Sequence, residues 1–132
     1  MPAISYVNLF AHDVEALARF YALVFGFAEI AAVRSPIFRA VDAGGCRIGF
    51  NAHAAYGLLD LADQAHWTGT SAMLTIDVGS ASEVDHRVAA AVSEGAELVK
   101  PPYRTAYHTY QAVLFDPEGH VVRINAALPE GG

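Results

Sequence analysis

The sequence predicts an α+β fold made of two copies of a β-α-β-β-β module. The same order of strand-like and helix-like patterns occurs twice along the 132 residues. Leu9 and Gly26 match Val78 and Gly95 at a spacing of 69 residues. At a spacing of 74, the matched sets are Gly45, Ile48, Phe50, Asn51, Ala52 and Gly119, Val122, Ile124, Asn125, Ala126. Because solenoids usually need at least three repeats, we expect two modules whose sheets curl around a shared cleft.

The first module covers about residues 1–55. Asp13 is placed to cap a helix that runs to Phe25, and Gly26 suits the left-handed conformation at its end. Apolar residues recur on one face of this helix, at Val14, Leu17, Ala18, Tyr21, Val24 and Phe25. The predicted strands are 4–10, 27–33, 37–42 and 46–53, with Gly44-Gly45 as the turn before the last.

The second module covers about residues 71–128, after a connector at 56–70. Ser80 and Glu83 have capping-box spacing for a helix to about Glu94, which Gly95 closes. The predicted strands are 74–78, 96–100, 110–115 and 121–126, with an irregular Pro- and Tyr-rich segment before the third and a turn at 116–119 before the fourth.

Composition limits the class of protein. The length of 132 residues indicates a single domain, 1–132, and 54% apolar residues argue against disorder. Eight basic residues against 14 acidic ones give a net charge of −6, which excludes a nucleic-acid-binding surface. The single cysteine excludes an internal disulfide, and no apolar stretch approaches the roughly 20 residues that span a bilayer. We therefore expect a cytoplasmic protein with no membrane partner.

Strand alternation places a polar set on the faces opposite the helices. Its members are Tyr6, Asn8, Arg47, Asn51, His53, Thr75, Asp77, Arg123 and Asn125. One interpretation is a ligand cleft with directional contacts, and the other is a solvated sheet face. The tyrosines at 103, 107 and 110 could likewise wall an aromatic pocket or lie in a surface loop.

Two segments resemble the vicinal oxygen chelate superfamily, which includes glyoxalase I, bleomycin-resistance proteins and extradiol dioxygenases. They are Tyr6-Val7-Asn8-Leu9 with the Arg19-Phe20-Tyr21 helix, and Leu114-Phe115-Asp116-Pro117-Glu118-Gly119-His120. The resemblance runs from about Ile4 to Leu128. It implies paired βαβββ modules around a cleft, commonly in a homodimer.

The resemblance also implies four positions for ligands of a divalent metal. Here they hold Tyr6, Gly49, Met73 and Arg123, none of which supplies the expected His, Glu or Gln. His53 and Asp77 are the nearest candidates, and two ligands fall short of a catalytic site. A guanidinium at position 123 would also repel a divalent cation. We therefore expect no metal and no cofactor.

The leading hypothesis is a small-molecule binding protein of the glyoxalase/bleomycin-resistance type. Arg47 and Arg123 favour a neutral or anionic ligand, because arginine can hold a carboxylate with two hydrogen bonds. The predicted ligand-binding residues are Tyr6, Asn8, Arg47, Asn51, His53, Tyr107, Tyr110, Arg123 and Asn125. The alternative is a divergent enzyme, either a metal-dependent lyase or dioxygenase or a metal-free isomerase using His53. A third possibility is an interaction module that uses the duplicated sheets only as a scaffold.

Overall fold

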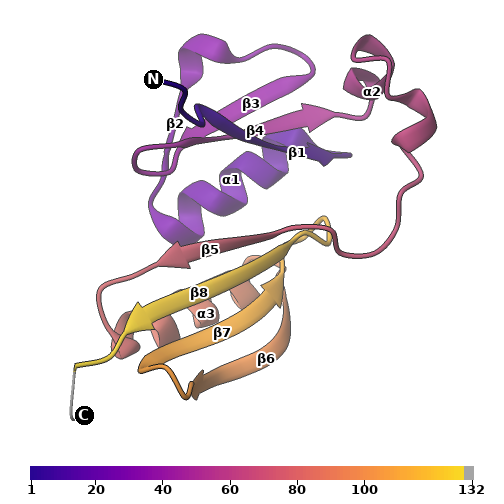
Figure 1. Cartoon of the computed structure of the whole chain (residues 1–132). Coiled ribbons are helices and arrows are strands. Elements are labelled where there is room, and N and C mark those ends of the chain that lie inside the picture. Colours follow the sequence, from indigo (N-terminus) through magenta and orange to yellow (C-terminus); the bar gives the residue numbers. More distant parts are fainter. Residues whose placement is uncertain (130–132) are drawn as a thin grey trace. The chain divides into compact units, whose positions relative to one another are not determined.

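The structure is a computed structural model that describes residues 1–129 (Figure 1). It divides into two compact units, one from Met1 to Gly69 and the other from Thr70 onward. Each unit holds one four-stranded mixed sheet and one long helix. The predicted α+β class and the repeated β-α-β-β-β order are confirmed, with a separate sheet in each unit.

The first unit has the strand order β1-β4-β3-β2, in which β1 runs parallel to β4 and the other pairs are antiparallel. Its elements are β1 (Tyr6–Ala11), α1 (Val14–Phe25), β2 (Ala28–Glu29), η1 (Ala31–Val33), β3 (Phe38–Asp42), β4 (Arg47–Ala52), α2 (Ala54–Leu58) and η2 (Ala62–Gln64). Helix α1 packs on β3 and β4, and Tyr21 lies with its ring centroid 5.4 Å from that of Phe50. Both side chains are fully buried.

The second unit repeats this plan with the strand order β5-β8-β7-β6 and a parallel β5–β8 pair. Its elements are β5 (Met73–Asp77), α3 (Ala81–Ser93), β6 (Glu97–Arg104), β7 (Thr109–Phe115) and β8 (Val121–Ala127). Val84 on α3 is buried, as are Leu114 on β7 and Ile124 on β8. They form the core between α3 and the sheet, and Ile124 lies on the helix side as the alternation predicted.

The helix ends follow their local signals. Asp13 accepts a hydrogen bond from the Ala16 backbone N–H at 3.0 Å, and Ser80 accepts one from the Glu83 N–H at 3.1 Å. Gly26 ends α1 at φ 73°, a conformation that costs glycine little. The Glu83 carboxylate accepts from the Gly79 N–H, one residue earlier than the partner in a standard capping box.

Most predicted strand ends differ from the structure by one or two residues, and three segments differ in kind. Of the strand predicted at 27–33, only β2 is extended, because the chain turns into the 3₁₀ helix η1. Strand β6 runs through Pro101 and Pro102 to Arg104, where an irregular segment was predicted. An outer strand tolerates prolines because its outward N–H groups need no partner, and the β6–β7 register shifts across this stretch. The last strand of the first unit ends at Ala52, and the connector begins with helix α2.

Within residues 1–129, no helix is long and apolar enough to cross a membrane.

Asp116 organises the turn between β7 and β8. Its side chain is 3% exposed and accepts hydrogen bonds from the backbone N–H groups of Glu118 at 2.9 Å and His120 at 3.0 Å. A carboxylate oxygen also lies 2.9 Å from Nδ1 of His120. One carboxylate therefore accepts from two backbone donors and contacts the His120 ring in the same turn.

We expect Asp116→Ala to lower the free energy of unfolding by about 2–4 kcal/mol, because buried donors lose a charged acceptor. Urea denaturation measures this loss. Asp63→Ala, at an exposed carboxylate in η2, is the matched control and should change stability by less than about 0.5 kcal/mol. Equal effects of the two substitutions would contradict the role given to Asp116.

Candidate functional site

The face of the first sheet opposite α1 carries a ladder of polar contacts. The parallel β1–β4 register sets Tyr6 beside Arg47 and Asn8 beside Gly49. Arg47 Nη1 donates to the Tyr6 hydroxyl at 3.0 Å, and Asn51 Nδ2 donates to Asn8 Oδ1 at 3.0 Å. The hydrogen bond to Tyr6 is the main cause that raises the pKa of the Arg47 guanidinium, so this group stays charged. The structure thus brings together four of the predicted site residues.

Gly49 makes this ladder possible. A Cβ at this position would overlap Asn8 Oδ1 and lie 2.8 Å from Cε1 of Phe38. The carboxamide of Asn8 and the ring of Phe38 therefore fill the space above Gly49. Phe38 also packs edge-on against Tyr6, with ring centroids 6.1 Å apart.

An aromatic cluster lies where β1 and β4 end. His53 follows β4 in a helical conformation at the start of α2, so it does not sit on the strand as predicted. Its ring stacks on His12 at 3.9 Å between centroids and meets Tyr56 edge-on at 5.4 Å. Tyr56 stacks on Phe10 at 3.9 Å. No pattern in the sequence indicates that His12 joins this cluster, because stacking across two strand ends depends on the path of α2.

The second sheet carries the matching ladder on β5 and β8. Arg123 Nε donates to Thr75 Oγ1 at 3.1 Å, and Asn125 Nδ2 donates to Asp77 Oδ1 at 3.1 Å. In both units a guanidinium rests on a hydroxyl of the neighbouring parallel strand, and a carboxamide donates to an oxygen of that strand. All four residues were predicted to share this face, and the register confirms that they do.

Gln111 was missing from the predicted site. It lies beside Asn125 in the β7–β8 register, is 4% exposed, and uses both ends of its carboxamide. Nε2 donates to the Tyr103 hydroxyl at 2.6 Å, and Oε1 accepts from the Tyr107 hydroxyl at 3.3 Å. Its position opposite Asn125 in the predicted hairpin was the available signal. Tyr107 thus lies beside this polar face, with 61% of its surface exposed.

Tyr110 is on the other side of the sheet. It pairs with Ala126, which is fully buried on the helix side, and its hydroxyl donates to Oδ1 of Asp85 on α3 at 2.7 Å. The hydrogen bond to Asp85 is the main reason that the pKa of Tyr110 is raised, with burial and the Asp85 charge adding to it. We therefore remove Tyr110 from the candidate site.

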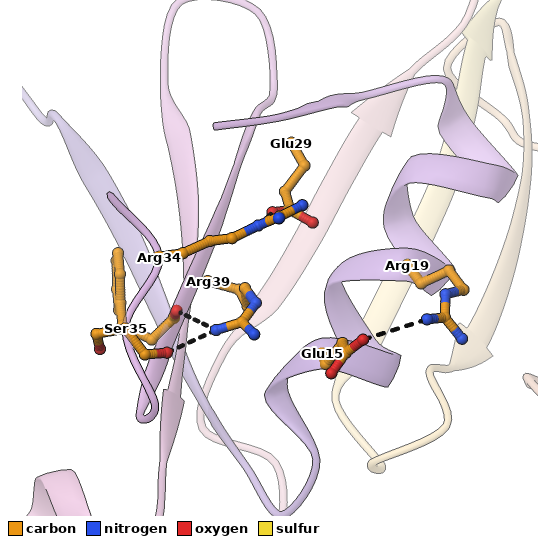
Figure 2. Close-up of polar contacts among 7 residues, drawn as sticks. Glu15, Arg19, Glu29, Arg34, Ser35 and Arg39 are labelled. Carbon is orange, nitrogen blue, oxygen red and sulfur yellow. Dashed lines mark hydrogen bonds and ion pairs between the residues drawn. The ribbon is translucent and has the colours of Figure 1, made fainter. Parts of the chain in front are cut away.

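Arginines elsewhere in the first unit have compensating partners, as Figure 2 shows. Arg19 pairs with Glu15 one helical turn away at 3.4 Å, and Arg34 pairs with Glu29. Arg39 donates to the Ser35 carbonyl at 2.6 Å and to the Phe38 carbonyl at 3.0 Å. Like Arg39, and unlike Arg19 and Arg34, the guanidinium groups of Arg47 and Arg123 form no ion pair with any described residue. Each donates a hydrogen bond to a neutral hydroxyl.

The repeated module and its four-stranded sheets define a vicinal oxygen chelate fold. The chain belongs to the glyoxalase-like domain family, whose model matches residues 6–125. Among curated proteins, none matches the chain.

Solved structures agree with this assignment. A glyoxalase/bleomycin resistance protein/dioxygenase family enzyme from Burkholderia phytofirmans PsJN is 50% identical, with a TM-score of 0.94, over 96% of this chain and 100% of that chain. A glyoxalase/bleomycin resistance protein/dioxygenase from Nocardioides is 23% identical, with a TM-score of 0.77, over 100% and 87%. A lactoylglutathione lyase from Agrobacterium tumefaciens is 18% identical, with a TM-score of 0.72, over 96% and 94%. The last two share the fold alone.

The four positions that the fold implies for a divalent metal do not fit one in this chain. Gly49 has no side chain, and the space above it is filled by Asn8 and Phe38. The Tyr6 hydroxyl already accepts from Arg47, Met73 offers only a thioether, and Arg123 is a cation. Among the described residues, no three His, Cys, Asp or Glu side chains cluster as a metal ion would require.

We expect Gly49→Ala to lower the free energy of unfolding by about 1–3 kcal/mol, because the new methyl group overpacks against Asn8 and the Phe38 ring. Urea denaturation measures the change. Gly57→Ala in α2 is the control, since no heavy atom lies within 4 Å of the added Cβ and alanine favours the helix. A Gly49→Ala variant as stable as the wild type would mean that the space above Gly49 is open.

The Tyr110–Asp85 hydrogen bond should make stability depend on alkaline pH. Because the pKa of Tyr110 is raised above its ordinary value of 10.0, the folded state keeps a proton that the unfolded state loses. The bond stabilises fully below pH 10, and its contribution falls as pH rises through the folded-state pKa. Denaturation at pH 8 and pH 11 should show Tyr110→Phe losing less stability with pH than the wild type does. Parallel losses would contradict this.

Proposed function

We propose that this protein binds a small neutral or anionic molecule on its polar sheet faces, without a divalent metal. The observation that supports this most directly is Arg123, in the middle of the second sheet's polar face. Its Nε donates to Thr75, while its terminal nitrogens donate to no acceptor among residues 1–129 and have no ion-pair partner there. A guanidinium held in place with its fork unused is a ready receptor for a carboxylate.

The acidic composition of the whole chain strengthens the argument from Arg123. With 14 acidic residues against 8 basic ones, ion-pair partners are abundant in the chain. Glutamates nevertheless pair with Arg19, Arg34 and Arg87 on other surfaces. Among the described residues, Arg123 is therefore a positive charge without an ion-pair partner although the whole chain is negative, and local charge decides which ligand binds.

Preorganisation is a second support. Arg47, Arg123, Asn51 and Asn125 are each held by a hydrogen bond to the neighbouring strand at 3.0–3.1 Å. A side chain that is already ordered loses little conformational entropy when a ligand arrives. Rigid strands also hold polar groups more accurately than loops do.

A second candidate is a metal-free enzyme in which His53 transfers a proton. The stack of His53 on His12 at 3.9 Å favours this candidate, because two imidazoles at one site can act as acid and base. The name of the 50% identical Burkholderia structure, a family enzyme, is consistent with it. The proposal further includes a homodimer, which the resemblance to the superfamily supports, and a cytoplasmic location, which the sequence analysis predicts.

The test combines metal and ligand binding. We expect equilibrium dialysis with Ni²⁺, Zn²⁺, Mn²⁺ and Fe²⁺ to give no stoichiometric uptake. Small carboxylic acids and their neutral amides should raise the melting temperature, whereas matched amines should not. Arg123→Gln should remove most of the stabilisation by acids, and Arg19→Gln, at an exposed paired arginine, should leave it unchanged.

Stoichiometric metal uptake that is lost in His53→Ala or Asp77→Asn would overturn the proposal. So would a preference for the amines. Turnover that resists chelators and disappears in His53→Ala would favour the second candidate.

A further inference from the structure

The two polar faces differ in what surrounds the arginine. In the β3–β4 register Arg47 lies opposite Asp42, whose negative charge adds to the raised pKa of Arg47. In the β7–β8 register Arg123 lies opposite Val113, an apolar residue. Arg47 is thus partly compensated by its own sheet, and Arg123 is not.

In the second sheet, residues that lie side by side on β5, β8 and β7 form a row across the sheet. Along the strands these rows change from apolar to polar. Towards the start of β8, the row next to Arg123 is Met73, Val121 and Phe115. Met73 is 44% exposed, and Val121 and Phe115 are half-buried, so this row presents apolar surface. Successive rows on one face are about 7 Å apart, since each residue of a strand rises about 3.4 Å. A ligand whose carboxylate binds Arg123 can therefore cover the Met73, Val121 and Phe115 row with an apolar group about 7 Å long.

The row on the other side of Arg123 is polar and already occupied. It consists of Asp77, Asn125 and Gln111. Asn125 donates to Asp77, and Gln111 is engaged by Tyr103 and Tyr107. Among the described residues no cation pairs with Asp77, so its charge repels a second negative group placed towards this row.

Resting on the proposed function, we infer that the second unit binds a monocarboxylate with an apolar body. The carboxylate takes the two terminal nitrogens of Arg123, and the apolar body covers Met73, Val121 and Phe115. Asp77 disfavours dicarboxylates. Burial of the apolar body strengthens binding in proportion to the apolar area removed from water, and acetate has almost no such area to bury.

The test is a calorimetric titration of the full chain with 3-phenylpropionate and four relatives. The amide 3-phenylpropionamide lacks the charge, 3-phenylpropylamine reverses it, phenylsuccinate adds a second carboxylate, and acetate lacks the apolar body. We expect 3-phenylpropionate to bind at least tenfold more tightly than each of the four.

Single substitutions test whether the ligand binds at Arg123 and the neighbouring apolar row. Arg123→Gln should bring the acid-to-amide affinity ratio close to one, an effect that general damage to the fold would not produce because it would weaken both ligands. Val121→Thr keeps the side-chain shape and should weaken 3-phenylpropionate several-fold while leaving acetate unchanged. Arg19→Gln, at an exposed arginine paired with Glu15, is the control, and its affinity ratio should equal that of the wild type.

The outcomes separate this inference from the proposed function. If the amide binds as well as the acid, or if Arg47→Gln and not Arg123→Gln removes the preference, the inference is wrong and small-molecule binding stands. Equal affinity for phenylsuccinate would overturn the role of Asp77. If no carboxylic acid and no amide binds, either in this titration or in the melting-temperature test of the proposed function, both proposals are wrong.

Discussion

Parallel pairing between the first and last strands of each unit is the constraint on which both polar faces depend. It sets Tyr6 beside Arg47 and Thr75 beside Arg123. Since side chains alternate along a strand, a shift of one residue in either register would turn these groups towards the helix. There they would replace buried side chains such as Phe50 and Ile124, and a charge would lose its hydration without a partner. Core packing and polar recognition therefore fix the same register.

The two units share a type of contact, although their arginines do not occupy matched positions of the duplication. A hydroxyl supports a guanidinium in both units, from tyrosine in one and threonine in the other. A carboxamide donates to an oxygen of the parallel strand in both, and that oxygen is neutral in Asn8 and charged in Asp77. The two units differ most clearly at Gly49 and Arg123, which match at the spacing of 74 residues. This position has no side chain in the first unit and carries a cation in the second. The two faces thus have different electrostatic characters on one backbone plan.

Local signals were sufficient for most of the fold. The caps at Asp13 and Ser80 and the left-handed Gly26 act within a few residues, so the sequence contains all that determines them. Alternation along β1, β4, β5 and β8 correctly placed the polar ladder.

Non-local contacts account for the errors. His53 leaves the strand because α2 begins there, and nothing in the strand pattern indicates that helix. Tyr110 points to α3 because its hydroxyl reaches Asp85, 25 residues away in the chain. Gln111 could be placed only once β7 was aligned with β8, because its partners Tyr103 and Tyr107 come from the strand and loop before it.

Strand β6 has a consequence for how this chain meets others. It is the outer strand of its sheet, and it carries the chain's single lysine, Lys100, followed directly by Pro101 and Pro102. Proline has no amide hydrogen to offer an incoming strand, and a charged ammonium resists being covered by one. This edge of the sheet is therefore a poor template for strand addition. It disfavours edge-to-edge aggregation, so association with other chains is favoured at other surfaces.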